Sequence, residues 1–309
     1  MPEVILHHYP LSLFAEKIRC LLACKRVPWR SVVQPDMMPK PDLTPLTGGY
    51  RRIPVMQVGA DVYCDTACIA RRLEELFPDP PCIPLHLAGE VAMIEEWADH
   101  RFTGQCVPSV VVELLPHLPE GILDDRAAMS PMLSKQAIFQ MAPHAWAQSL
   151  LSMDILEKRL RDRAWLAGDA FTLADAACYH PLWFVRRVPK LYEAVLARPA
   201  LAAWMDRIAA FGAGDATAMD SAEALAIGKA SHPADVHGGG GSAGSGISPG
   251  DTVAIRADDF GTEVTGGTVV RITGDEITIL REDATLGEIA VHFPRSGYVV
   301  IPQAATRAA

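Results

Sequence analysis

The first 78 residues alternate between the hydrophobic period of a strand and that of a helix, and this alternation constrains the fold most. Residues 4–9 read VILHHY, a β-like run that Pro10 ends. Residues 12–26 then carry apolar side chains at helical spacing, with Ser12 in the N-cap position, and residues 29–34 form a second β-like run. A strand–helix–strand unit pairs its strands in parallel, so a parallel pair is expected here.

Residues 55–64 predict a β-hairpin, because VMQV and VYC flank a Gly-Ala-Asp turn. A helical pattern follows from Asp65 and stops at Pro78. Pro54 opens the hairpin; proline has no N–H for a sheet ladder, and it is the residue at which a cis peptide bond costs least. Since a hairpin is antiparallel, the whole sheet must be mixed.

From about residue 88 to residue 211 the pattern is helical throughout, with apolar residues three and four positions apart. Within this region, Thr172 and Asp175 match a capping box, in which each side chain satisfies a backbone N–H at a helix start. The pattern predicts an all-helical domain.

The C-terminal third predicts a linker followed by a small β-domain. Residues 221–230 read as a short helix, and the glycine-rich run 238–246 reads as a flexible linker. Five short alternating segments then describe a small SH3-like β-barrel that folds by itself. The predicted boundaries are therefore 1–80 (mixed α/β), 86–212 (all-helical), 213–247 (linker) and 248–305 (β-barrel).

Composition narrows the functional classes. The 309 residues carry a net charge of −9, which argues against nucleic-acid and anionic-membrane partners. The seven cysteines are an odd number, form no CxxC pair and predict free thiols in a reducing compartment rather than a metal site. The sequence has no signal-peptide pattern and no apolar stretch of membrane-spanning length, so a cytoplasmic protein is expected.

Several motifs together resemble the cytosolic glutathione transferase family over roughly residues 4–211. RIPV matches the cis-proline strand of that family, and Asp65-Thr66 matches its acid–hydroxyl pair at the third helix. TLAD at 172–175 and RPALAAWMDRI at 198–208 match its helical-domain motifs. The resemblance implies a thioredoxin-like α/β domain followed by an all-α bundle, and it leaves the C-terminal barrel unmatched.

The resemblance also implies a glutathione site. Ile53, held by Pro54, would pair its backbone N–H and C=O with the cysteinyl part of the tripeptide, as an added strand does. Asp65 and Thr66, at a helix N-terminus, would receive the γ-glutamyl group. Arg52 would meet the carboxylate at the glycine end.

Two residues are candidates for activating the glutathione thiol. Ser12 stands where serine-type transferases keep their hydroxyl, although it is also a plausible helix N-cap. Tyr9 is the second candidate, one position later than the tyrosine of tyrosine-type enzymes. A cysteine in place of Ser12 would have implied thiol–disulfide exchange, so its absence argues against a reductase of that type.

The resemblance therefore predicts a homodimeric glutathione transferase that conjugates glutathione, its co-substrate, to a small electrophile and needs no metal. Two alternatives stay open. One is a catalytically silent binding protein on the same scaffold, which uses its barrel to recruit a partner. The other is a different glutathione-dependent enzyme, such as a dehalogenase, an isomerase or a peroxidase.

Overall fold

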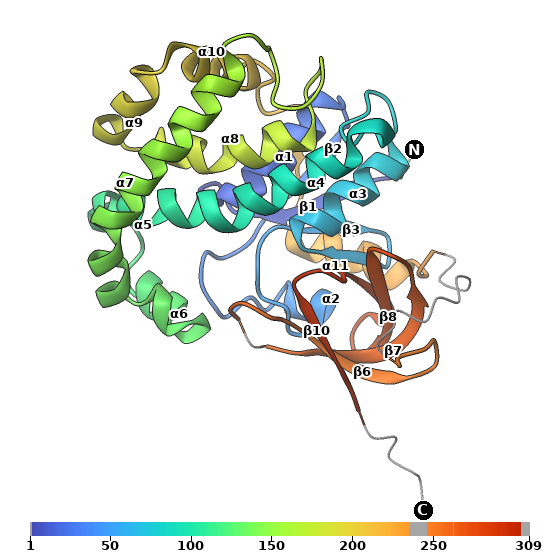
Figure 1. Cartoon of the computed structure of the whole chain (residues 1–309). Helices are drawn as coiled ribbons and strands as arrows, with labels where there is room; N and C mark the ends of the chain where they lie inside the picture. The colour runs from blue at the N-terminus through green and yellow to red at the C-terminus, as the bar shows by residue number, and fades with distance from the viewer. Residues whose placement is uncertain (1, 235–245, 262, 304–309) are drawn as a thin grey trace, which may run out of the picture. The chain divides into compact units, whose positions relative to one another are not determined.

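The structure is a computed structural model that describes residues 2–234, 246–261 and 263–303. It divides into two compact units (Figure 1). The helical unit comprises residues 11–27 and 70–215, and the sheet unit comprises residues 1–10, 28–69 and 216–309. Most of the predicted linker run 238–246 lies outside the described residues.

The helical unit is built around α8, whose thirteen residues from Leu173 to Val185 are all buried. α8 packs against α1 (Leu13–Cys24), α4 (Ala88–Glu96) and α5 (Thr103–Leu114). The other α-helices of this unit are α6 (Ile122–Met129), α7 (Lys135–Leu160), α9 (Pro189–Leu196) and α10 (Pro199–Ala209). The residues of α3 (Thr66–Leu76) are divided between the two units. The predicted all-helical domain is confirmed.

The capping box at the start of α8 is present as the sequence indicates. Asp175 Oδ2 accepts from the Thr172 N–H at 2.9 Å, and Asp175 Oδ1 accepts from the Trp204 indole N–H at 2.8 Å. The same carboxylate therefore caps α8 and holds α10 against it through a hydrogen bond.

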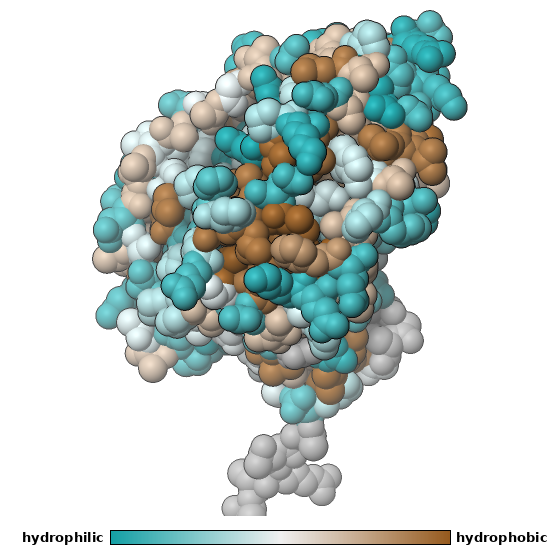
Figure 2. Space-filling model, turned by 90° about the vertical axis from the view of Figure 1, so that its left-hand side faces the viewer, coloured by the Kyte–Doolittle hydropathy of each residue, from teal (hydrophilic) through white to brown (hydrophobic). Residues whose placement is uncertain are grey.

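Some apolar side chains of the helical unit are exposed. Leu151 and Ile155 of α7 are each 58 % exposed. Figure 2 shows a face of the molecule on which apolar side chains gather.

A buried ionic cluster joins α1, α4, α8 and the helical segment Trp97–Phe102 that follows α4. Lys17 of α1 is fully buried, and its Nζ lies 2.7 Å from Glu95 Oε1 and 2.5 Å from Asp99 Oδ2. Asp99 Oδ1 also lies 3.1 Å from Nε2 of His180 on α8. Burial disfavours the Lys17 ammonium, but the two carboxylates outweigh it and hold the pKa of Lys17 above its ordinary value. The cluster depends on Lys17 as its permanent cation.

The first part of the sheet unit has the predicted mixed sheet. β1 (Val4–His8) pairs in parallel with β2 (Trp29–Val33) and antiparallel with β3 (Val55–Val58). β3 pairs with β4 (Asp61–Cys64) through a tighter turn than predicted, since Asp61 already belongs to β4. Gly59 lies in that turn with a φ of 62°, which glycine adopts without a steric cost. The short strand β5 (Ala216–Ala218) pairs with β2, and α2 (Thr44–Thr47) precedes β3.

The C-terminal strands continue this sheet. They are β6 (Thr252–Ala257), β7 (Thr265–Ile272), β8 (Glu276–Asp283), β9 (Gly287–Pro294) and β10 (Tyr298–Pro302). Five predicted segments thus become five strands, referred to here as the C-terminal module. β9 pairs in parallel with β4, and the sheet order becomes β10-β6-β7-β8-β9-β4-β3-β1-β2-β5.

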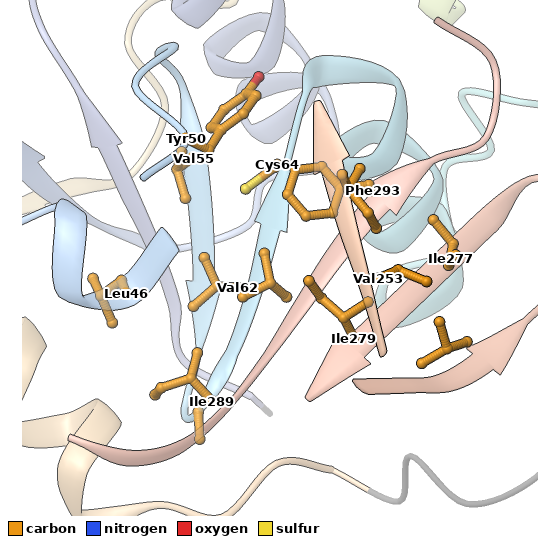
Figure 3. Close-up of a cluster of buried hydrophobic side chains, with 14 of the residues drawn as sticks. Leu46, Tyr50, Val55, Val62, Cys64, Val253, Ile277, Ile279, Ile289 and Phe293 are labelled. Atoms are coloured by element: carbon orange, nitrogen blue, oxygen red, sulfur yellow. The ribbon is translucent and has the colours of Figure 1, made fainter. Parts of the chain in front are cut away.

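The module shares a hydrophobic core with the first domain. Tyr50, Val55 and Val62 pack in one cluster with Ile279 and Phe293 of the module (Figure 3). This differs from the prediction of an independently folding barrel on a flexible tether. The physical reason is that the edge of β4 needs a cover, and β9 supplies both hydrogen bonds and apolar side chains to it. Helix α11 (Ser221–Ala230), predicted from the Ala-rich segment, also belongs to the sheet unit.

A buried histidine reinforces the junction of β4 and β9. His292 Nε2 lies 2.9 Å from Asp61 Oδ1 on β4, and its Nδ1 lies 3.1 Å from Glu276 Oε1 on β8. The ring also stacks on Tyr63, with 4.2 Å between centroids. Burial disfavours the imidazolium, but the hydrogen bonds and charges of Asp61 and Glu276 outweigh it and raise the pKa of His292.

This raised pKa predicts a pH-dependent contribution to stability. Because the folded protein holds the proton on His292 more tightly than the unfolded chain, the contribution is complete below the unfolded pKa of about 6.5 and is lost as pH rises through the folded pKa. We expect the difference in free energy of unfolding between the wild type and His292→Gln to shrink as pH rises from 6 to 9. Urea unfolding at several pH values measures it, and a difference that stays constant would contradict the prediction.

Candidate functional site

The candidate site in the sheet unit begins at the end of the β3–β4 hairpin. Val55 pairs with Cys64, so the next residues outward, Pro54 and Asp65, lie beside each other. The peptide bond between Ile53 and Pro54 is cis. The Ile53 side chain packs against the shared core, and its backbone N–H and C=O have no hydrogen-bond partner in the described part of the chain. The N–H and C=O groups of Ile53 are therefore available for hydrogen bonds to a ligand beside the sheet.

Asp65 and Thr66 form the N-terminus of α3. Asp65 has a φ of 76°, and its Oδ1 accepts from the Ala67 N–H at 2.9 Å, so it caps the helix. Thr66 is the first residue of α3 and is 5 % exposed. Asp is among the residues that tolerate this left-handed backbone, because its short side chain bonds locally.

Residues of the C-terminal module hold both charged ends of this site. The Arg52 guanidinium pairs with the Asp259 carboxylate and with the Phe260 carbonyl, and it lies 4.1 Å from the centre of the Phe260 ring. At the other end, the Tyr298 hydroxyl donates to Asp65 Oδ2 at 3.0 Å. Burial and the Asp65 charge raise the pKa of Tyr298, so its hydroxyl keeps its proton and remains a donor.

The two thiol-activating candidates belong to different units. Ser12 is in the helical unit as the N-cap of α1, is 3 % exposed, and its Oγ accepts from the Ala15 N–H at 3.2 Å. Tyr9 is in the sheet unit and follows β1, half-buried. The preceding His8 donates to, or accepts from, Ser31 Oγ at 2.8 Å. Since the N-cap bond uses Ser12 Oγ as an acceptor, the Ser12 hydroxyl proton can still be donated.

Comparisons with known proteins identify the family. A sequence profile of the glutathione S-transferase N-terminal domain matches residues 6–81, and one of the glutathione S-transferase C-terminal domain matches residues 127–211. The chain belongs to the glutathione S-transferase family. This confirms the predicted fold class of a thioredoxin-like domain followed by a helical domain, and the C-terminal strands beyond it are also present.

Three proteins to which this chain is similar differ in how much of it they match. The crystal structure of a GST-like protein from Pseudomonas syringae is 37 % identical, covers 98 % of this chain and 100 % of that chain, and has a TM-score of 0.82. The FtsZ-localized protein A of Caulobacter vibrioides is 24 % identical over 182 residues, which are 57 % of this chain and 74 % of that protein. A glutathione S-transferase from Methylobacterium radiotolerans in complex with glutathione sulfonate shares the fold, at 23 % identity over 68 % of this chain and 92 % of that chain, with a TM-score of 0.51.

The helical unit of this glutathione S-transferase family member also contains a cavity of about 470 Å³. Arg19, Trp183, Arg187 and Tyr179 line part of it, and Arg187 lies 4.2 Å from the centre of the Trp183 ring. None of the predicted site residues lines this cavity. The described residues contain no cluster of His, Cys, Asp and Glu suited to a metal ion, and all seven cysteines are free.

Sequence reasoning missed the three residues that occupy the site from the module. Asp259 and Phe260 follow β6, and Tyr298 begins β10. Nothing in their local pattern distinguishes them from ordinary turn and strand residues, since only the pairing of β9 with β4 brings the module to the hairpin. The unusual pair Arg51-Arg52 before Pro54 was the one available signal, because both arginines bind acidic residues of the module.

Proposed function

We propose that this glutathione S-transferase family member binds glutathione at Arg52, Ile53, Pro54, Asp65 and Thr66 and transfers its sulfur to a small electrophile. The observation that carries the proposal is the open backbone pair of Ile53. It lies between a cation, Arg52, and the N-terminus of α3 at Asp65. An extended tripeptide with charged ends suits such an arrangement, because main-chain hydrogen bonds fix its middle and opposite charges fix its ends.

In this proposal Ser12 stabilises the glutathione thiolate, and Tyr9 is the second candidate for that role. The nucleophile is the sulfur of the bound peptide, so the reaction forms a carbon–sulfur bond and expels the leaving group of the electrophile, or adds to an activated double bond. The hydroxyl donor favours the thiolate over the thiol.

Among the described helices, none combines the length and the apolar character of a membrane-spanning segment. From the family to which the chain belongs, we infer that the protein acts as a cytoplasmic homodimer.

Calorimetry combined with light scattering tests the binding step. We expect one glutathione per chain in a particle of twice the 33.4 kDa chain mass. Arg52→Gln should weaken glutathione binding about tenfold or more, because it removes a charged hydrogen bond to a ligand carboxylate. Arg187→Gln, which changes an exposed arginine that lines the helical cavity, should leave the affinity unchanged. Equal affinities of wild type and Arg52→Gln would refute the assigned glycine end.

Product analysis tests the transfer step. Incubation with aryl halides, alkyl halides and hydroperoxides separates conjugation from dehalogenase and peroxidase chemistry.

A catalytically silent binding protein is the second candidate function. The observation that favours it is that Arg52 and Asp65 are already bound by Asp259 and Tyr298 of the same chain. A binding protein of this kind would show no turnover with any electrophile, even in variants that bind glutathione.

A further inference from the structure

The C-terminal module presents to the site a carboxylate and a hydrogen-bond donor, the two kinds of group that the ends of glutathione would bring there. Asp259 brings a carboxylate to Arg52, where the glycine carboxylate of the tripeptide is expected. Tyr298 brings a hydrogen-bond donor to Asp65, where the γ-glutamyl ammonium would be the matching donor. Along the hairpin, the Asp259 carboxylate and the Tyr298 hydroxyl therefore follow the same order as the glycine carboxylate and the γ-glutamyl ammonium of the proposed ligand.

We propose that Asp259, Phe260 and Tyr298, called here the cap residues, compete intramolecularly with glutathione for Arg52 and Asp65. This inference rests on the proposed function, since it concerns the regulation of the same site. In this proposal glutathione uses the guanidinium face of Arg52 and the carboxylate oxygen of Asp65 that the cap residues bind, so the two partners compete. The site is consequently occupied when the cap is in place and available when it is displaced.

The cap can be displaced without dissociation of the module. The Asp259 side chain is 31 % exposed, and β10, which begins at Tyr298, is an edge strand of the sheet. By contrast, the attachment of the module through β9 is buried, and His292 and Asp61 there are 4 % and 3 % exposed. Partly exposed ion pairs open at a low cost, while buried ones do not. Opening therefore requires release of the Asp259–Arg52 pair and movement of the Tyr298 ring away from Phe293 at the side of the core, but no separation of β9 from β4.

The middle of the site remains open while its ends are closed. Among the residues that the structure describes, none hydrogen-bonds to the Ile53 backbone groups, so the cap residues do not imitate the cysteinyl part of glutathione. A thiol peptide thus gains two backbone hydrogen bonds that the cap does not make. This difference gives glutathione a free-energy advantage by which it can displace the cap, and its apparent dissociation constant rises in proportion as the open fraction falls.

The test compares the full-length wild type with the double variant Asp259→Asn/Tyr298→Phe. Both substitutions keep the side-chain shape. They remove the carboxylate charge that pairs with Arg52 and the hydroxyl that donates to Asp65. Calorimetric titration with reduced glutathione should give an affinity about tenfold higher for the double variant, because two competing hydrogen bonds to charged groups are lost. Thermal unfolding establishes that both proteins are folded.

A matched control removes one carboxylate from the same module away from the site. Asp283 pairs with Arg281, and Asp283→Asn changes the net charge as Asp259→Asn does. Its glutathione affinity should equal that of the wild type. Addition of Arg52→Gln to the double variant should abolish the gain, because the freed guanidinium is the group that the ligand uses.

The outcomes separate the two proposals. If the wild type and the double variant bind glutathione equally well, the site is real and the competition is refuted. If neither protein binds glutathione, the proposed function fails, and the cap has no ligand to exclude. An equal gain from Asp283→Asn would also refute the competition, because the effect would then follow net charge alone.

Discussion

Replacement of Lys17 by methionine is expected to destabilise the helical unit by about 3–5 kcal/mol, because it leaves two carboxylates in the core without their cation. Lys17 is fully buried against Glu95 and Asp99. Methionine fills a similar volume, so the loss reports the uncompensated charge rather than a cavity. Urea unfolding followed by far-UV circular dichroism measures the change.

Lys190 provides the matched control for this substitution. Its side chain is 77 % exposed and pairs with Glu113 at 3.5 Å. Lys190→Met should therefore cost less than about 1 kcal/mol, as exposed ion pairs do. A loss below about 1 kcal/mol for Lys17→Met as well would mean that the cluster takes up protons or water when its cation is removed.

Ser12→Ala is expected to lower the turnover of glutathione conjugation at pH 7 about 25-fold while glutathione affinity changes little. A free thiol with a pKa near 8.5 is only about 3 per cent thiolate at pH 7, and a decrease of about two units, or ~2.7 kcal/mol, would ionise roughly three quarters of it. If the Ser12 hydroxyl supplies most of that stabilisation, its loss returns the pKa of the thiol of bound glutathione to the value of a free thiol. Stopped-flow absorbance of bound thiolate against pH measures the shift directly. The assay is best made in the Asp259→Asn/Tyr298→Phe background as well.

The structural role of Ser12 requires its own control. Ser12 and Ser134 are both serine N-caps, with Oγ accepting from Ala15 and Ala137 respectively. Both alanine variants should lose about 1 kcal/mol of stability, but only Ser12→Ala should raise the thiol pKa. Ser12→Thr keeps the cap and the hydroxyl and should retain turnover. An unchanged thiol pKa in Ser12→Ala would transfer the role to another donor, with Tyr9→Phe as the next variant.

Element order and type could be predicted because the apolar periods are strong and the breakers are well placed. Pro10, Pro54 and Pro78 mark element boundaries, and the Thr172–Asp175 box marks the start of α8. The sequence predicts a hairpin turn that is one residue longer than the observed one, since Asp61 has the residue type of a turn but is the buried partner of His292 in β4. The assigned glutathione residues remain a prediction from motifs.

Long-range pairing could not be predicted. An alternating segment such as residues 287–294 shows which side chains share a face, but not which strand edge it joins. The pairing of β9 with β4 depends on the fit of both partners, and it decides that Asp259 and Tyr298 reach Arg52 and Asp65. Likewise, Lys17 in an amphipathic helix gave no indication of its buried carboxylates, because charged residues at such positions are usually solvated.

The parallel pairing of β9 with β4 also bears on how such a protein can evolve. A domain joined only by a linker can be gained, lost or exchanged by recombination at that linker. Here, loss of the last five strands would leave Val62 and its neighbours without cover and β4 without a neighbour on one side. The C-terminal module and the strands β1–β4 must therefore be inherited together. Mutations in β4 are selected for their fit to β9, and mutations in β9 for their fit to β4.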